Sequence, residues 1–175
     1  MRWININEKY LDYLRSFEKW IPYSDYGDKK YKPFFGVLFE VGDLYYVTQV
    51  SHPQKRHYNL KQQKDFYKIY DPKCPNRLIA VVNLNYMFPV PATETSYFHK
   101  REIHTYRKFD SEIEKSKYVN LLDIELQVVN SMGLDNKARY IYELKYKNPM
   151  HFVSKRCIDF REMEKLAKKF SQCQY

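Results

Sequence analysis

The alternation of apolar and polar residues divides the chain into a helix, a group of strands and a second group of helices. Residues 8–20 carry apolar side chains at three- and four-residue steps, and Asn7 before them can cap a helix. Residues 34–40 and 44–50 are rich in β-branched and aromatic side chains, and the Gly-Asp pair between them is a hairpin signal. These patterns predict one helix followed by a β-hairpin.

Two further strands and a short third strand are predicted next. Residues 65–70 and 77–84 flank a turn that is rich in Pro, Asp and Asn. Residues 86–90 continue as a strand, which Pro89 and Pro91 confine to an edge or an end of the sheet because proline donates no hydrogen bond to a neighbouring strand.

The second half of the chain is mainly helical by the same criteria. Ser111 and Glu114 have the spacing of a capping box, and the apolar stripe that follows ends near Gly133. Residues 135–146 form a further predicted helix. Asp159 can cap a last helix, which carries its own apolar stripe.

Two segments in this half do not follow the helical pattern. Residues 152–157 are predicted as a short strand, and residues 93–108 as loop or strand. There is no internal repeat, low-complexity tract or linker, so residues 1–175 are expected to form a single domain. The predicted class is α+β, a small antiparallel sheet surrounded by about four helices.

Composition changes the picture of what this domain binds. The chain has 30 Lys+Arg against 21 Asp+Glu, a net charge of +9, and 18 of its residues are tyrosines. Positive charge attracts polyanions over long distances, and tyrosine rings offer flat faces on which unpaired bases stack. Tyrosine also packs routinely with its hydroxyl at the surface. Together these features favour a partner that is RNA or a single strand over duplex DNA.

Several classes of protein are disfavoured. No apolar run approaches the roughly 20 residues that span a bilayer, and the N-terminus lacks the apolar segment of a signal peptide. Cys74, Cys157 and Cys173 are far apart and odd in number, which argues against a disulfide framework. No paired Cys or His spacing typical of zinc occurs. We therefore expect a cytoplasmic protein with no membrane association, no metal and no cofactor.

The stretch from Ser51 to Tyr58 is the most informative part of the chain. An apolar strand opens there into Ser-His-Pro-Gln-Lys-Arg-His-Tyr, which places a hydroxyl, two cations and two imidazoles within seven residues. Pro53 both stops the strand and stiffens the turn. Polar groups held at the end of a strand by a rigid scaffold form either a solvated basic loop or a functional site.

Several segments resemble the ToxN/AbiQ endoribonucleases, the protein toxins of type III toxin–antitoxin and phage abortive-infection systems. The resemblance includes Lys-Pro-Phe-Phe-Gly-Val-Leu at 32–38, the segment 51–55, and Asn-Leu-x-x-Met-x-Pro at 83–89, in the family's order and with its separations. Tyr-Leu pairs in the first helix, residues 118–129 and the start of the last helix extend it over most of the chain. The abortive-infection protein AbiQ is the closer member.

The resemblance implies a compact domain built on a twisted antiparallel sheet, and metal-independent cleavage of cellular or phage RNA inside a bacterial cell. It further implies that a small pseudoknot RNA, which the toxin itself cuts from tandem repeats, holds the toxin inactive. In this family the RNA lies in a basic groove past the active site, and protein and RNA units assemble into closed hetero-oligomers.

The resemblance assigns site residues one at a time. Ser51 matches the serine of the family's Ser-Pro-Lys motif, and Lys32 matches a functional lysine before the first strand. An inserted His52 separates the serine from the proline. The motif lysine therefore maps onto Gln54 by count or onto Lys55 by chemistry, and we take Lys55 because the reaction uses a cation.

Metal-independent RNA cleavage uses the 2′-OH of the substrate as nucleophile and leaves a 2′,3′-cyclic phosphate and a 5′-OH. Lys32 and Lys55 suit neutralisation of the charge that develops on the phosphate. Ser51 can donate to, or orient, the scissile phosphate or the 2′-OH. Since a hydroxyl is a poor base, proton abstraction requires a neighbour such as His57 or a lysine of depressed pKa.

The expected RNA-binding surface surrounds the hairpin and includes a second basic cluster near residue 100. Tyr26 and Tyr31 are both candidates for the family's functional tyrosine. Two other classes remain open: a non-catalytic RNA-binding module, and a metal-dependent nuclease, which would need clustered carboxylates. The predicted RNA-binding residues are Tyr26, Lys29, Lys30, Tyr31, Arg56, Tyr58, Lys61, Lys64, Lys100 and Arg101.

Overall fold

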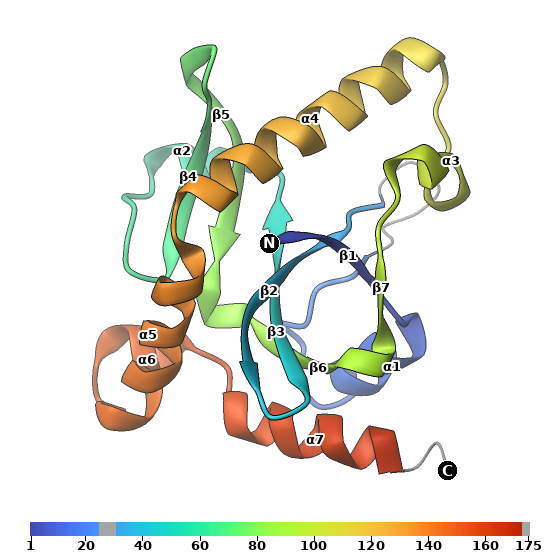
Figure 1. The fold of residues 1–175 in the computed structure, drawn as a ribbon. Helices are drawn as coiled ribbons and strands as arrows, with labels where there is room; N and C mark the ends of the chain where they lie inside the picture. The colour runs from blue at the N-terminus through green and yellow to red at the C-terminus, as the bar shows by residue number, and fades with distance from the viewer. Residues whose placement is uncertain (25–30, 173–175) are drawn as a thin grey trace.

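An antiparallel sheet forms the centre of the molecule in the computed structural model, which describes residues 1–24 and 31–172 (Figure 1). The strand order in this part of the chain is β4-β5-β3-β2-β1-β7, and β6 pairs with β3 outside that path. The strands are β1 (Arg2–Ile6), β2 (Phe34–Val41), β3 (Leu44–Ser51), β4 (Phe66–Asp71), β5 (Cys74–Asn83), β6 (Phe88–Pro91) and β7 (Thr95–Tyr97).

Helices surround this sheet. Four helices of the described part have eight residues or more: α1 (Glu8–Arg15), α4 (Glu112–Ser131), α5 (Leu134–Lys147) and α7 (Phe160–Gln172). Shorter helical segments are α2 (Lys55–Asn59), α3 (Ile103–Tyr106), α6 (Phe152–Arg156) and the 3₁₀ turns η1 (Leu84–Tyr86), η2 (Ala92–Glu94) and η3 (Lys100–Glu102). The predicted α+β class is confirmed.

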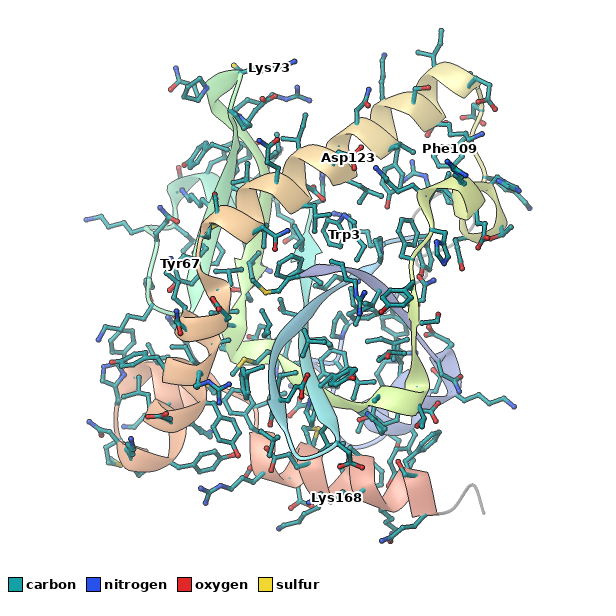
Figure 2. The ribbon with its side chains drawn as sticks, in the orientation of Figure 1. Trp3, Tyr67, Lys73, Phe109, Asp123 and Lys168 are labelled. Carbon is teal, nitrogen blue, oxygen red and sulfur yellow. The ribbon has the colours of Figure 1, made fainter. Side chains whose placement is uncertain are left out.

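Both predicted hairpins are present. Gly42 turns the chain between β2 and β3 with φ +61°, a left-handed conformation that glycine adopts without steric cost. The β4–β5 hairpin is longer than predicted, since pairing continues from Phe66↔Asn83 to Asp71↔Cys74. Lys73 lies at its tip, away from the rest of the sheet (Figure 2).

Strand β3 changes partners along its length, and this change positions the candidate site. Its first half pairs with β6, from Leu44↔Pro91 to Val47↔Phe88. Its last two residues instead pair with β5, as Val50↔Val82 and Ser51↔Val81. Ser51 therefore lies at the junction between the main sheet and the β4–β5 hairpin.

The long helix α4 crosses the sheet next to β1 (Figure 1). Ser111 caps it as predicted, because its side chain accepts a hydrogen bond from Glu114 N at 3.2 Å. Trp3 of β1 lies beneath the helix (Figure 2) and its indole N–H donates to the Leu122 carbonyl at 3.1 Å. This contact fixes the helix against the strand.

The last helix, α7, closes the opposite side of the molecule (Figure 1). Asp159 caps it as predicted, accepting from Glu162 N at 3.1 Å. Tyr46 of β3 donates its hydroxyl to Glu164 at 2.7 Å, and its ring is fully buried. The sheet is thus covered by α4 on one side and by α7 on another.

Three expectations need correction. The segment predicted as a strand at 152–157 instead forms helix α6 (Phe152–Arg156). His151 caps this helix, and Lys145 Nζ donates hydrogen bonds to the Ser154 and Cys157 carbonyls, each at 2.9 Å. Residues 93–108 contain a short strand but also η3 and α3. The first helix ends at Arg15, well before residue 20, and continues only as turns.

Strand β1 was not predicted at all. It is only five residues long, and four consecutive residues of it are buried. Because β2 and β7 pair with its two edges and both faces are covered, its sequence lacks the apolar–polar alternation of a half-exposed strand.

Candidate active site

Ser51 ends β3 and is half-buried, at the start of the turn that Pro53 stiffens. Helix α2 follows, and the Gln54 backbone N–H donates to His57 Nδ1 at 3.0 Å, which closes the first turn of this helix. The backbone of Ser51 is thus positioned by strand pairing on one side and by the start of α2 on the other.

Lys32 lies beside this serine. The β2–β3 register pairs Phe34 with Gln49, so Lys32, two residues before Phe34, lies level with Ser51. Its Nζ donates a hydrogen bond to the Val50 carbonyl at 3.2 Å, and this carbonyl belongs to the peptide that joins Val50 to Ser51.

A buried carboxyl faces this lysine. Glu125 is 1% exposed, on the side of α4 that also carries Tyr118 and Leu122, and Tyr118 donates its hydroxyl to the Tyr31 carbonyl at 2.6 Å. Glu125 Oε1 has no hydrogen-bond partner among the described residues. Burial raises the pKa of Glu125 to about 7, against the opposing effect of the Lys32 charge.

The pKa of Lys32 itself is lowered. Burial is the main cause, the Glu125 carboxylate opposes it, and the nearby Arg107 guanidinium adds to it. Arg107 also contacts Glu114 at 3.0 Å and lies over the Tyr118 ring at 4.3 Å. A partly buried lysine with a lowered pKa and a buried carboxyl beside it are features typical of functional sites.

The two histidines of the turn have different environments. His52 is exposed, and its pKa is lowered by partial burial and by the charge of Lys32. His57 is buried against Phe66, with ring centroids 5.7 Å apart. Burial and the charges of Arg56 and Lys68 lower the pKa of His57. Both ring nitrogens of His57 accept hydrogen bonds, Nδ1 from the Gln54 backbone N–H at 3.0 Å and Nε2 from Arg56 Nε at 3.3 Å.

The remaining predicted cations of this region lie on the surface around α2. Lys55, the first residue of α2, is exposed, as are Arg56, Lys61 and Lys64. Tyr58 is 57% exposed and its ring is accessible to a stacking base. Of these residues, Arg56 and Lys61 line one cavity.

Other predicted RNA-binding residues are not on this surface. Tyr31 is buried, and its ring stacks on Tyr106 with centroids 5.0 Å apart, so it presents no face to solvent. Lys100 pairs with Asp123 at 2.5 Å, which offsets its charge. Arg101 is exposed beside it on η3. Tyr26, Lys29 and Lys30 lie outside the described residues.

Sequence reasoning missed Glu125 and Lys68. Glu125 falls on the inward side of α4 with Tyr118, Leu122 and Val129, and an acidic residue in such an apolar stripe was the available signal. Lys68 lies on β4 opposite Val81, which is itself opposite Ser51. Its Nζ donates to the Tyr58 carbonyl at 2.8 Å and so ties β4 to α2.

Within 1–24 and 31–172, no group of three or more His, Cys, Asp or Glu side chains is arranged to hold a metal ion. In the same part of the chain, no helix combines the length and the apolar character needed to cross a membrane.

The structure is that of a basic α+β protein, in which Ser51 ends a strand and Lys32 is hydrogen-bonded to the neighbouring Val50 carbonyl. The chain belongs to the family described as toxin ToxN of type III toxin–antitoxin systems, whose family model matches residues 2–168. A curated relative, endoribonuclease ToxN of Pectobacterium atrosepticum, is 29% identical over 100 residues, which are 55% of this chain. That match spans 57% of the relative's own length.

Solved structures show the same fold. AbiQ, a lactococcal anti-phage endoribonuclease of the type III toxin–antitoxin system, superposes with a TM-score of 0.75 at 19% identity, covering 98% of both chains. A structure from work on a processed non-coding RNA that regulates a bacterial antiviral system superposes with a TM-score of 0.78 at 21% identity. The match covers 97% of this chain and 99% of the other. A third structure, from work on selective toxin inhibition by a non-coding RNA pseudoknot, superposes with a TM-score of 0.75 at 21% identity, covering 97% of each chain.

Proposed function

We propose that this protein is a metal-independent endoribonuclease, the toxin of a type III toxin–antitoxin system that acts in abortive infection of phage-infected bacteria. The observation that carries the proposal is the Lys32 ammonium, 3.2 Å from the Val50 carbonyl and next to the Ser51 peptide. A cation and a hydroxyl held together at a rigid strand end suit a phosphodiester. Membership of the ToxN family supports the same reaction.

In the proposed reaction the RNA 2′-OH attacks the adjacent phosphorus, and the bond to the 5′-oxygen breaks. The products are a 2′,3′-cyclic phosphate and a 5′-OH. Lys32 and Lys55 stabilise the negative charge on the phosphate oxygens, and Ser51 donates a hydrogen bond that orients the phosphate. One well-placed donor to a developing oxyanion contributes about 3–4 kcal/mol.

His52 is our candidate for the group that accepts the 2′-OH proton. Its pKa is lowered, so the imidazole is neutral near pH 7, and its ring is exposed beside Lys32. The expected base was a neighbour such as His57 or a lysine of depressed pKa. The ring of His57 is buried, and its Nδ1 accepts the Gln54 N–H. We therefore assign His57 the role of holding the turn that carries Ser51 and Lys55.

We also propose the partners that the family relationship suggests. A repeat-derived pseudoknot RNA inhibits the toxin, is processed by it and assembles with it into a hetero-oligomer in the bacterial cytoplasm. The relative studied with a pseudoknot RNA supports this part of the proposal. The exposed cations Arg56, Lys61 and Lys64 with Tyr58 would contact the RNA backbone and bases.

The test is incubation of the purified protein with labelled RNA in excess chelator, followed by identification of the product ends. We expect cleavage to persist in chelator and every new 3′ end to be a cyclic phosphate. Loss of cleavage in chelator, or 3′-OH ends, would contradict the proposed chemistry. Binding with steep salt dependence but no cleavage would identify an RNA-binding module instead.

A further inference from the structure

A polar cavity lies on the same side of the sheet as Ser51. Its volume is about 380 Å³, within the usual range of small-ligand pockets. Helix α2, the loop before β4, the end of β5, η1 and the end of α6 together enclose it. The side chains that matter to the argument are His57, Phe66, Asn83, Asn85, Tyr86 and Arg156.

The sheet register places this cavity close to Ser51. Ser51 of β3 pairs with Val81 of β5, and Asn83 is two residues after Val81 on β5. The side chains of Ser51 and Asn83 therefore project from the same face of the sheet. Phe66 lies directly opposite Asn83 on β4 and projects from that face as well. With a strand spacing of about 4.8 Å and a rise of about 3.4 Å per residue, the Ser51 and Asn83 backbones are roughly 8 Å apart.

The walls of the cavity are fixed by hydrogen bonds that do not use Asn83. Asn85 donates its side-chain Nδ2 to the Arg156 carbonyl at 3.4 Å, and its backbone carbonyl accepts from Ile158 N at 3.1 Å. Arg156 Nε donates to the buried Asp65 carboxylate at 2.6 Å. This ion pair neutralises the acidic side chain of the lining, so the charge of Arg56 and Lys61 at the cavity is left uncompensated.

The side-chain amide of Asn83 is the polar group of the cavity that is available to recognise a ligand. It is half-buried at the cavity wall, and no hydrogen bond of its side-chain amide to another described residue is found. An amide presents a donor and an acceptor side by side, which is the pattern that reads the edge of a base. Phe66 and Tyr86 supply aromatic surface for the base plane.

We propose that this cavity binds one unpaired nucleobase of the RNA strand whose phosphate lies at Ser51, and that the Asn83 amide reads its edge. The proposal rests on the proposed function and names its specificity determinant. It also gives a role to the Asn-Leu-x-x-Met-x-Pro segment, which the reaction at Ser51 leaves unexplained. Among the possible occupants, a base attached to a polyanion fits the basic rim and the aromatic and amide walls.

The test measures binding, so that it does not depend on cleavage. Short single-stranded RNAs that vary one position at a time are titrated into the Ser51→Ala protein, and dissociation constants are compared for the four bases. We expect one position at which the best and worst bases differ by about tenfold or more. Adding Asn83→Ala is expected to abolish that difference, and Asn83→Asp, which replaces the donor by an acceptor, to change the preferred base.

Asn136→Ala, an exposed asparagine on α5, is the matched control and is expected to leave the base preference unchanged. Base discrimination that survives Asn83→Ala in a folded protein would overturn the inference, as would the absence of any discriminated position. Failure of the wild-type protein to cleave RNA would overturn the proposed function instead. The binding measurement thus separates the two outcomes.

Discussion

At the scale of the residue, the environment of Lys32 determines what the site can do. Three of the buried carboxylates in the described part are hydrogen-bonded: Asp65 to Arg156, Asp71 to Lys73 N, and Glu94 to Asn7. The fourth, Glu125, leaves one oxygen without a partner. A buried carboxyl that is incompletely bonded reduces stability and is kept where its charge is useful.

The first prediction concerns the pH dependence of stability. The pKa of Glu125 is raised from 4.5 to about 7. A carboxyl whose folded pKa exceeds its unfolded pKa contributes stability below pH 4.5 that is lost as the pH rises through 7. Glu125→Gln removes this titration, and we expect it to raise the free energy of unfolding at pH 8 by about 2–3 kcal/mol relative to wild type, with little gain at pH 4.5.

Urea denaturation at the two pH values measures this difference. Glu94→Gln is the matched control, because Glu94 is also buried but already accepts a hydrogen bond from Asn7 at 2.7 Å. Equal effects of Glu125→Gln at both pH values would show that Glu125 does not titrate as described.

The second prediction separates the two histidines. His52→Ala removes the proposed base and is expected to lower the cleavage rate by about 100-fold or more with unchanged thermal stability. His57→Ala removes the acceptor of the Gln54 N–H and is expected to cost about 1 kcal/mol of stability. Thermal unfolding and single-turnover cleavage of each variant check this. The opposite pattern would return the role of base to His57.

The site was only partly predictable at this scale. Ser51 and Lys32 were predicted from the resemblance to a family, and the Lys32 ammonium lies 3.2 Å from the carbonyl of Val50, the residue before Ser51. Glu125 was missed because it acts from a helix about 90 residues away, and no local signal connects it to Lys32. Tyr31 was expected to contact RNA, but a tyrosine in a basic segment can equally be buried, as this one is.

At the scale of the element, local signals predicted what local contacts determine. The two hairpins and helices α4, α5 and α7 have turn or capping residues within their own sequence, and each was predicted. Helix α6 was wrongly predicted as a strand. Hydrogen bonds from Lys145, on another helix, to the Ser154 and Cys157 carbonyls help to hold it. Partners of that kind leave no pattern in the segment itself.

The third prediction concerns the ion pair that joins α6 to the loop before β4. The Asp65 side chain is only 2% exposed and that of Arg156 is 38% exposed. Arg156→Ala leaves a buried carboxylate unpaired, so we expect a loss of about 3 kcal/mol in the free energy of unfolding at pH 7. Lys165→Ala breaks an exposed pair with Glu162 and is expected to cost less than about 0.5 kcal/mol. Chemical denaturation compares the two, and equal losses would refute the structural role of Arg156.

At the scale of the whole molecule, the net charge of +9 is distributed unevenly. The exposed cations Arg56 and Lys61 line the cavity, whereas several cations elsewhere are paired with acids, namely Lys100, Lys147 and Lys165. Composition predicted a polyanionic partner but not this arrangement, because only the fold determines which lysines lie together.

The fourth prediction follows from this distribution. The logarithm of RNA affinity should fall linearly with the logarithm of salt concentration, and each lost phosphate contact reduces the slope by about 0.7 for a single strand. Replacing Lys61 and Lys64 by alanine is therefore expected to reduce the slope by about 1.4. Lys168 and Lys169 of α7, a helix at the other end of the molecule from α2 (Figure 1), are the control pair. An unchanged slope for the first pair would remove those residues from the RNA surface.

The central claim is that Ser51 and Lys32 hold a phosphodiester so that the 2′-OH of the RNA cleaves it. The most direct measurement is the single-turnover cleavage rate of Ser51→Ala beside that of Ser96→Ala, an exposed serine on β7. Loss of one oxyanion donor predicts a rate about 100- to 1,000-fold lower for Ser51→Ala, with RNA affinity and folding retained. A Ser51→Ala protein that cleaves as fast as Ser96→Ala would contradict the claim.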